Sequence, residues 1–459
     1  MNNETICAIS TAPGQGAIAI IRVSGKDSII ICKKLFLSKN GESLSNTKNQ
    51  QVILGNIRHK SNTIDEVLIT VFNAPRSYTG ENMVEIACHG STYIQSKIIQ
   101  ILIEHGCRLA KKGEFTLRSF LNGKLDLSQA EGVANLISSE NARSHDLAMK
   151  QMRGGFSNEI KILRDKFIKF ASLIELELDF SQEDVEFANR TDLINLIKKI
   201  KSKISVLTES FKLGNAIKHG IPITIIGHPN SGKSTLLNQI LNEDRAIVSD
   251  VMGTTRDVIE ESITLDGYKF RFIDTAGLRK TSDKIEKIGI SKTHQKILES
   301  AFVLYMIDKT DFHQNKIENE IINIQNKLSS NQSLIIAANK SDINTETIAL
   351  NKLKNCDIID ISAKNGDGVK KLLNTILSQI NKWEELADSI IVINHRHFES
   401  LKKTMNSIQD VEKGLKLNLS GELLSIDIKN CLNNLGEITG EITNDNLLDS
   451  IFKDFCIGK

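Results

Sequence analysis

The sequence is poor in proline and aromatic residues, and it contains no long apolar run. Only 4 of its 459 residues are proline and 5% are aromatic, a composition that favours a protein rich in helices. No run of about 18 apolar residues occurs, so we expect no membrane span. The first residues, Met1 to Glu4, lack the basic start and apolar stretch of a signal peptide. We therefore expect a cytoplasmic protein.

The cysteines and the charge balance argue against further classes of protein. The chain has 7 cysteines but no C-x-x-C pair, so we expect neither a zinc site nor a disulfide framework. Its 58 basic and 56 acidic residues give a net charge of +2. That balance excludes the strongly basic composition of a histone-like binder, but it allows a local patch for RNA. The length suffices for roughly two to four domains.

The most informative stretch reads as a buried strand, a glycine-bracketed loop and a helix start. Apolar residues 223–226 precede residues 227–234, Gly-His-Pro-Asn-Ser-Gly-Lys-Ser, which match the phosphate-binding pattern G-x-x-x-x-G-K-[ST]. The glycines let backbone N–H groups turn toward phosphate oxygens, and the helix start adds its positive end. Lys233 would reach the β- and γ-phosphates, and Ser234 would hold Mg²⁺. An ordinary glycine-rich turn is the alternative. Such a turn does not require a buried strand before it and a helix after it, whereas a phosphate-binding loop does.

The hydrophobic pattern divides the chain into an α+β part, helical parts and an α/β part. We expect a compact α+β domain at 1–120, a helical domain made of 121–218 and 381–459, and a doubly wound α/β nucleotide domain at 219–380 inserted into it. In the first domain, strands are expected at 18–23, 67–72 and 84–87, and helices near 27–36 and 92–105. In the nucleotide domain, the expected elements are 222–226, 234–241, 269–273, 285–298, 301–307, 316–328, 333–338, 358–361 and 367–381.

Two apolar stripes at helical spacing predict helices that pack against other helices. One consists of Leu193, Ile197, Ile200, Ile204, Leu207 and Phe211, and the other of Ile160, Leu163, Phe167, Phe170, Ile174 and Leu178. In the α+β domain, charged residues lie at strand ends and turns, where solvated side chains are the simplest interpretation. They are Arg22, Glu81, Glu85 and His89.

Three further motifs each follow a predicted strand and together predict GTP rather than ATP. Residues 274–277, Asp-Thr-Ala-Gly, place an acid where it can hold the water shell of Mg²⁺. Asp342, in the Asn-Lys-Ser-Asp segment 339–342, can accept two hydrogen bonds that guanine offers and adenine does not. Residues 362–364, Ser-Ala-Lys, would back the base. The residues expected to bind GTP are Asn230, Ser231, Gly232, Lys233, Ser234, Thr235, Ser249, Thr254, Thr255, Asp274, Thr275, Ala276, Gly277, Asn339, Lys340, Asp342, Ser362, Ala363 and Lys364.

The segment 253–257, Gly-Thr-Thr-Arg-Asp, is expected to be a switch. A threonine there can ligate Mg²⁺ only when the γ-phosphate is present, so Mg²⁺ would be held by Ser234 and Thr255. Leu278 stands where Ras-like proteins carry a glutamine that positions water, and an aliphatic side chain cannot do this. Glu286, Arg279 or a cation beside Asn230 could supply what is missing.

These motifs, with three further blocks, resemble the MnmE (TrmE) family of tRNA-modification GTPases along the whole chain. The blocks are residues 77–81 with His89 and Gly90, residues 113–127, and the terminal residues 455–459, Phe-Cys-Ile-Gly-Lys. The resemblance implies an N-terminal domain that binds folate and dimerises, a helical domain and an inserted GTPase domain. It also implies a homodimer, an FAD-dependent partner protein in a heterotetramer, and tRNA as substrate. The expected product is an aminomethyl or carboxymethylaminomethyl group on C5 of the wobble uridine.

The resemblance further implies particular ligands. A 5-formyltetrahydrofolate or related one-carbon donor would contact Arg22, Glu85, Lys124 and Lys459. K⁺ would be ligated by Asn230, Ser249, Val251 and Thr254, in place of an arginine finger, and Glu286 would activate water.

Cys456 and the overall function leave alternatives open. Cys456 fits a prenylation box poorly, so a packed thiol or a role at the folate or uridine site remains. A ribosome-assembly GTPase and a signalling switch are the competing functions. A ribosome-assembly GTPase usually carries an RNA-binding module, such as one with a G-x-x-G loop, and none occurs outside the phosphate loop. Folate binding by residues 1–120 would separate the tRNA-modifying enzyme from both.

Overall fold

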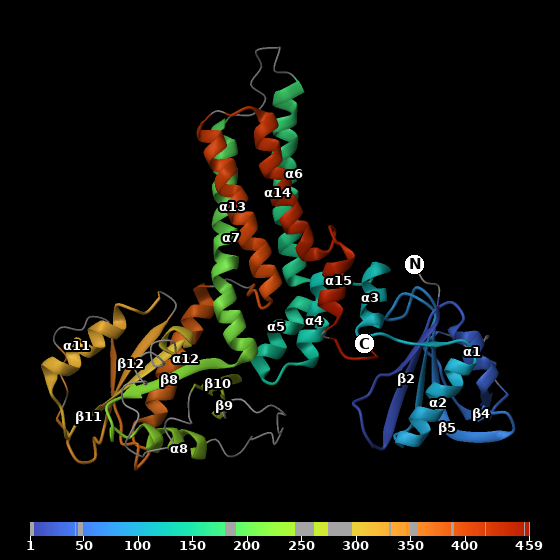
Figure 1. Cartoon of the computed structure of the whole chain (residues 1–459), viewed down its shortest axis with the longest axis horizontal. Helices are drawn as coiled ribbons and strands as arrows, with labels where there is room; N and C mark the ends of the chain where they lie inside the picture. Colours follow the sequence, from blue (N-terminus) through green and yellow to red (C-terminus); the bar gives the residue numbers. More distant parts are fainter. Residues whose placement is uncertain are drawn as a thin grey trace. The chain divides into compact units, whose positions relative to one another are not determined.

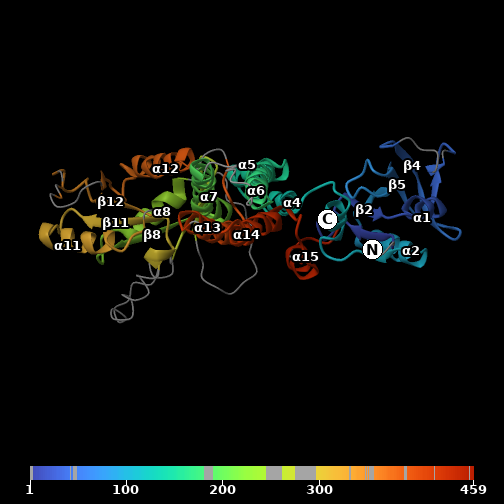
Figure 2. The same cartoon turned by 90° about the horizontal axis from the view of Figure 1, so that it is seen from above.

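The computed structural model describes residues 4–41, 43–44, 49–179, 190–243, 261–273, 296–329, 332–346, 348, 350, 356–386, 390–417, 419–453 and 455–458. The chain divides into two compact units. The first comprises Met1–Ile137, Gln151–Asp165 and Leu432–Lys459, and the second comprises Ser138–Lys150 and Lys166–Cys431. Figure 1 labels the helices and strands, and Figure 2 shows them from above.

The first unit contains a sheet of seven strands in the order β3-β4-β5-β6-β2-β1-β7. Every neighbouring pair is antiparallel except β1 with β7. The strands predicted at 18–23, 67–72 and 84–87 and both predicted helices are confirmed. The strands are β1 (Ile6–Ile9), β2 (Ile18–Ser24), β3 (Phe36–Ser38), β4 (Val52–His59), β5 (Asn62–Phe72), β6 (Met83–His89) and β7 (Arg108–Leu109), and the helices are α1 (Ser28–Leu35) and α2 (Thr92–Glu104).

The two faces of this sheet differ because side chains alternate along each strand. Ile21, Ile69 and Ile86 point to one face and are buried in a core shared with α1 and α2. Arg22 and Glu85 belong to the opposite face, where they stand directly across from each other on β2 and β6. On that face, Phe115 of α3 (Glu114–Leu121) packs with Ile6 and Ala8 of β1 in a second, smaller core cluster.

The second unit contains a sheet of six strands in the order β13-β12-β11-β8-β10-β9. All neighbours are parallel except β9 and β10, so the predicted doubly wound α/β fold is confirmed. The edge strand β9 was not predicted, and most of the helix predicted at 285–298 lies outside the described residues. The strands are β8 (Ile221–Gly227), β9 (Glu261–Leu265), β10 (Tyr268–Phe272), β11 (Phe302–Asp308), β12 (Ser333–Asn339) and β13 (Asp357–Asp360).

Helices cover both faces of this second sheet, as the sequence predicted. The helices α8 (Lys233–Glu243) and α12 (Val369–Leu386) share one core with the strands, and α11 (Gln314–Gln325) shares another on the opposite face. Alternate residues of β11 divide between the two cores, with Leu304 on one side and Tyr305 on the other. Because β8, β11, β12 and β13 are parallel, their carboxyl ends meet at one edge.

Long helices make up most of the rest of the chain. The two predicted stripes are confirmed, since all their described side chains except Phe211 are buried. Phe211 is half-buried, and its ring stacks on Phe398 with 4.5 Å between ring centroids. The side chain of Leu178 lies outside the part that the structure describes. The helices are α4 (Leu127–Ile137), α5 (Ala142–Met152), α6 (Gly155–Asp179), α7 (Arg190–His219), α13 (His395–Lys416), α14 (Gly421–Thr439) and α15 (Asp445–Phe452). None of the helices in the described ranges is long and apolar enough to cross a membrane.

An ion pair with one buried partner joins two strand ends of the second sheet. Lys309, directly after β11, places its Nζ 2.8 Å from Oδ1 of Asp360, the last residue of β13. The Lys309 side chain is 1% exposed, whereas the Asp360 side chain is 47% exposed. A charge left alone in the interior is far more costly than a charge that water can reach. The pair is therefore asymmetric, because the lysine depends on the aspartate more than the reverse.

This asymmetry predicts unequal effects of removing each partner. Asp360→Ala should lower the free energy of unfolding by about 3 kcal/mol, because it leaves the buried ammonium without its carboxylate. Lys309→Met should cost less than about 1 kcal/mol, because the freed carboxylate is half in water. Trp383, the only tryptophan of the chain, stacks on Phe302 at 4.9 Å between ring centroids and so reports this domain in urea unfolding followed by fluorescence. Equal losses, or a larger loss for Lys309→Met, would contradict the prediction.

Candidate functional site

The phosphate loop has the strand–loop–helix geometry that the sequence predicted. β8 ends at Gly227 and α8 begins at Lys233. Gly227 has φ 148°, and a Cβ there would lie 2.5 Å from the carbonyl oxygen of Met306. Gly232 has φ 97°, and a Cβ there would lie 2.1 Å from Nδ2 of Asn339. Both positions therefore require glycine, for conformation as well as for space.

Two polar side chains of this loop fit a bound anion. The Ser231 side chain is fully buried, and its Oγ has no hydrogen-bond partner among the described residues. Nζ of Lys233 donates to the carbonyl oxygens of Gly227, at 3.0 Å, and His228, at 2.7 Å. Burial lowers the pKa of Lys233. A phosphate would give the ammonium a negative partner in place of neutral carbonyls, and it would offer oxygens to the Ser231 hydroxyl.

The other described members of the phosphate loop lie around it. Asn230 adopts a left-handed conformation with φ 62°. Ser234 is half-buried and Thr235 is exposed on the first turn of α8, where the N-terminal end of the helix dipole favours anions.

Asn339 joins the phosphate loop to the segment expected to contact the base. Its side chain is buried at the end of β12, where Nδ2 donates to the carbonyl oxygen of Ser231 at 2.8 Å. Its Oδ1 accepts from the backbone N–H of Ala363 at 2.9 Å. The backbone N–H of Ser341 donates to the carbonyl oxygen of Ile361 at 3.1 Å, which draws the two loops together a second time. The structure thus assembles residues from three strand ends around one side chain.

The other residues predicted to contact the base lie on the neighbouring strand ends and loops. Lys340, with φ 66°, forms an ion pair with Asp308 at the end of β11. Burial raises the pKa of Asp308, but hydrogen bonds from Lys340 and Thr310 outweigh this effect and hold the pKa below its usual value. Ser362 is buried behind these loops, while Asp342 and Lys364 are exposed. Asp342 is thus open to a ligand, as a carboxylate that reads a base must be.

The predicted switch segments and the predicted water-activating residue lie outside the described residues. The predictions that lie outside the described residues are Ser249, Val251, Thr254, Thr255, Asp274, Thr275, Ala276, Gly277, Leu278, Arg279 and Glu286. Of the predicted K⁺ ligands the structure describes Asn230, and of the predicted Mg²⁺ ligands it describes Ser234. Within the described ranges, no group of three or more histidine, cysteine, aspartate or glutamate side chains could hold a metal ion.

A second polar site lies on the N-terminal sheet, in the first unit. Nε of Arg22 donates to Oε1 of Glu85 at 2.7 Å, and each side chain is 22% exposed. The Arg22 guanidinium carbon lies 5.5 Å from the ring centroid of Tyr78. Nζ of Lys124 donates to the carbonyl oxygen of Pro75 at 3.2 Å, in the loop that carries Tyr78. Three of the four predicted folate contacts therefore lie on or against neighbouring elements. Arg22 lies on β2, Glu85 lies on β6, and Lys124 is bound to the loop 73–82 before β6.

The C-terminal segment docks onto the same unit. Phe452 and Phe455 pack with Leu127 in a small core. Ser10 donates its hydroxyl to the carbonyl oxygen of Gly458 at 3.1 Å, just after β1. In the pairing of β1 with β2, Ala8 stands opposite Arg22. Lys459 itself lies outside the described residues. Its neighbour Gly458 is bound to Ser10, two residues after Ala8, the residue that pairs with Arg22.

Cys456 corrects one interpretation made from the sequence. Its side chain is exposed, so it is not a packed thiol. Its carbonyl oxygen accepts from the backbone N–H of Gly113 at 3.3 Å, which fixes the segment through the main chain rather than through sulfur.

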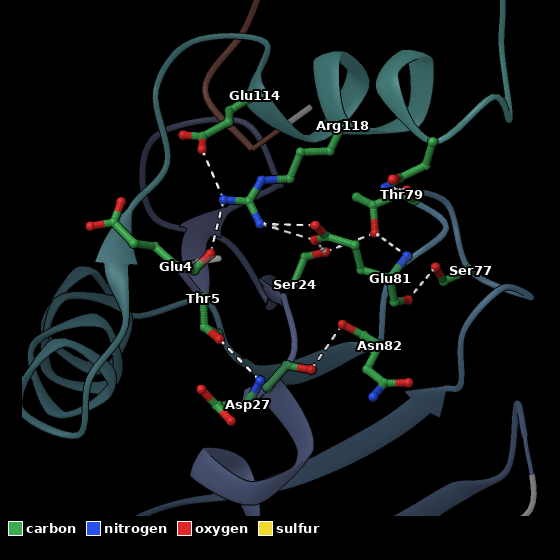
Figure 3. Close-up of polar contacts among 12 residues, drawn as sticks. Glu4, Thr5, Ser24, Asp27, Ser77, Thr79, Glu81, Asn82, Glu114 and Arg118 are labelled. Carbon is green, nitrogen blue, oxygen red and sulfur yellow. Dashed lines mark hydrogen bonds and ion pairs between the residues drawn. The ribbon is translucent and has the colours of Figure 1, made fainter. Parts of the chain in front are cut away.

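A network of polar side chains beside Arg22 was not anticipated from the sequence (Figure 3). Arg118, on α3, donates through Nη1 to both carboxylate oxygens of Glu81, at 3.2 and 3.0 Å. Glu81 Oε2 accepts from the Ser24 hydroxyl at 2.8 Å, and the Ser24 and Thr79 hydroxyls are 2.7 Å apart. These residues come from separate segments, so no spacing in the sequence connects them. The sequence signals were that Glu81 and Arg118 lie in two of the blocks of resemblance, 77–81 and 113–127, and that Glu81 was noted as a charged residue at a turn.

Comparison with known families covers nearly the whole chain. The family model described as "GTP-binding protein TrmE N-terminus" matches residues 5–124, and the one described as "MnmE helical domain" matches residues 127–456. Proteins named "tRNA modification GTPase MnmE" are 52% identical over 466 residues in Flavobacterium johnsoniae and 49% identical over 473 residues in Bacteroides thetaiotaomicron. Both alignments cover 100% of this chain and 100% of the relative. The chain therefore belongs to the MnmE (TrmE) family.

Proposed function

We propose that this protein is a GTPase that acts in tRNA modification. The single observation that carries the proposal is the pair of hydrogen bonds from Asn339, which joins the phosphate loop to the base-recognition segment. The names of the full-length relatives supply the tRNA half of the proposal, because they are called tRNA modification GTPases. A signalling switch or a ribosome-assembly GTPase would use the same nucleotide site, and the full-length relatives decide against both.

The nucleotide site selects guanine through Asp342. This exposed carboxylate accepts hydrogen bonds from the guanine N1–H and exocyclic amine, whereas adenine presents neither donor in that arrangement. Ser362 and Ala363 back the base, and the bond from Ala363 to Asn339 fixes their distance from the phosphate loop. Lys233 and the backbone of the loop hold the phosphates.

Hydrolysis depends on residues outside those that the structure describes. Glu286 is proposed to orient and deprotonate the attacking water, since Leu278 cannot. Ser234 and Thr255 would hold Mg²⁺, and Asn230, Ser249, Val251 and Thr254 would hold K⁺ between two GTPase domains. When bound, these cations supply positive charge to the phosphoryl oxygens.

The N-terminal sheet is proposed to bind a tetrahydrofolate one-carbon donor, such as 5-formyltetrahydrofolate. Glu85 offers a carboxylate to the amide and amine donors of a pterin, and Arg22, Lys124 and Lys459 offer cations to the glutamyl carboxylates. When bound, the folate supplies the one-carbon unit. Its delivery to C5 of the wobble uridine requires tRNA and the FAD-dependent partner protein. A role of Cys456 at the folate or uridine site remains a prediction.

A homodimer through the N-terminal domain is proposed to complete this site. The face of the sheet that carries Arg22 and Glu85 also carries apolar side chains in water. Ile18 is 68% exposed, Val52 56%, Leu68 46% and Leu54 41%, and the strand pairing places all four on that face. Exposed apolar patches of this kind mark interfaces, and a second copy of the chain is the occupant that we propose.

Asp342→Asn should change the preferred base. An asparagine amide cannot accept both guanine donors, but it can donate to the 2-oxo group of xanthine and accept from its N1–H. We expect GTP affinity to fall at least about tenfold and XTP affinity to rise by a similar factor in equilibrium titrations. Glu346→Gln, which alters an exposed carboxylate four residues after Asp342, is the matched control and should retain wild-type affinities. A variant that still prefers GTP would refute the role of Asp342.

Glu286→Ala should separate hydrolysis from binding. GTP affinity should stay at the wild-type value, while the hydrolysis rate should fall about 100-fold because the general base is lost. The wild-type rate should also drop when Na⁺ replaces K⁺, which steady-state phosphate release can measure. Glu385→Ala, in an exposed part of α12, should hydrolyse GTP normally. Wild-type turnover by Glu286→Ala would remove Glu286 from the proposal.

A further inference from the structure

The loop before β6 stands between two of the proposed folate contacts. Tyr78 lies in this loop with its ring under the Arg22 guanidinium, and Pro75 accepts the hydrogen bond from Lys124. Asn122, two residues before Lys124, donates through Nδ2 to the carbonyl oxygen of Thr79 at 2.7 Å. One loop thus contacts both cations and the turn that carries one of them.

The loop is fixed on both sides of Tyr78. Before it, the Ser77 hydroxyl donates to the carbonyl oxygen of Glu81 at 2.5 Å. After it, Thr79 contacts Ser24, which follows Arg22 by two residues on β2. Ser77, Thr79 and Ser24 are all buried, so these bonds are shielded from competing water.

Arg118 anchors this arrangement to α3. It is 8% exposed and spans three acceptors, with Glu81 on the loop, Glu114 on its own helix at 3.1 Å and the carbonyl oxygen of Glu4 at 2.9 Å (Figure 3). A guanidinium with several fixed acceptors holds their relative positions more strictly than a single bond can. Glu81 therefore cannot move without breaking bonds to both β2 and α3.

The Tyr78 ring itself is held by its hydroxyl and by apolar packing. Its Oη lies 2.9 Å from Oγ1 of Thr116, which is fully buried on α3. The ring packs against the small cluster that contains Ile6, Ala8 and Phe115. Burial raises the pKa of Tyr78, so the phenol stays neutral and its ring face stays available to a cation at physiological pH.

Arg22 is thus constrained from two directions. Its Nε is bound to Glu85, and the Tyr78 ring supports the guanidinium carbon. Among the described residues its only hydrogen bond uses Nε, which leaves the Nη donors to face a ligand carboxylate. An arginine whose orientation is set before binding loses less entropy when the ligand arrives.

We propose that Tyr78 is a positioning residue for the one-carbon donor, acting through Arg22, and that the network of Arg118, Glu81, Ser24 and Thr79 fixes the loop that carries it. This inference rests on the proposed folate site. It adds to that site a residue that is held by α3 rather than by the strands. It also predicts that Tyr78 affects the affinity for a folate that carries a glutamyl carboxylate, and not the affinity for the pterin alone.

A double-mutant cycle on the full chain tests the inference, with 5-formyltetrahydrofolate affinity measured by calorimetry. Tyr78→Leu removes the ring and should weaken binding about 3- to 30-fold, the range that a cation–π contact supports. Tyr78→Phe keeps the ring over Arg22 and should stay within about threefold of wild type. Tyr93→Leu is the matched control, because Tyr93 is an exposed tyrosine on α2, which covers the opposite face of the sheet.

The decisive arm repeats Tyr78→Leu in an Arg22→Met background. If Tyr78 acts through Arg22, the additional loss should disappear there, whereas a merely structural tyrosine would cause the same loss in both backgrounds. An equal loss in both backgrounds, or full affinity in Tyr78→Leu alone, would overturn the inference and leave the folate site standing. A wild-type chain that binds no 5-formyltetrahydrofolate would overturn the folate site and this inference together.

Discussion

The two hydrogen bonds of the Asn339 side chain determine how the nucleotide site is assembled. One reaches the phosphate loop and the other reaches the segment that we propose lies behind the base, so a single buried amide sets the separation of the two segments. The same residue adds to the reason why Gly232 is glycine, since its positive φ disfavours other residues and a Cβ there would also collide with Nδ2 of Asn339. The parallel sheet makes this possible because it brings the ends of β8, β11 and β12 to one edge, and the ion pair of Lys309 with Asp360 ties β13 to that edge.

The N-terminal sheet follows a different physical rule. Alternation along antiparallel strands buries one face under α1 and α2 and leaves the other open, and it is on this open face that we propose the folate donor and a second copy of the chain to bind. Charged residues on the open face would ordinarily be solvated, but Arg22 and Glu85 are only 22% exposed and pair with each other. The Tyr78 ring lies against Arg22, Arg118 bonds to Glu81 in the loop that carries Tyr78, and the docked C-terminal segment bonds to Ser10, just after β1. The residues around Arg22 come from segments that are remote in the chain. Their relative positions therefore depend on hydrogen bonds between side chains rather than on the conformation of one loop.

The sequence predicted those features that have a local signature. The phosphate loop, the alternation of strands and helices in the nucleotide domain and the two helical stripes each depend on spacing within a short stretch, and all are confirmed for the residues that the structure describes. The edge strand β9 was missed because a short antiparallel strand has no crossover pattern. Cys456 was interpreted with packing as one alternative, yet exposure is set by tertiary docking that composition does not encode. Arg118 and Tyr78 carried no signal beyond a block of resemblance, since their partners lie in other segments. The domain boundaries, the switch residues and Glu286 stay predictions.

The measurement that tests this account most directly is the affinity for tripolyphosphate, which occupies only the phosphate half of the site, compared with the affinity for GTP. Both should be measured by competition in the wild-type chain and in Asn339→Ala. If the amide couples the two halves, Asn339→Ala should weaken both ligands, because the phosphate loop loses its bond to Nδ2 even when no base is present. Unchanged tripolyphosphate affinity in Asn339→Ala would contradict the account, since the phosphate loop would then be organised without the residue on which the assembly is said to depend.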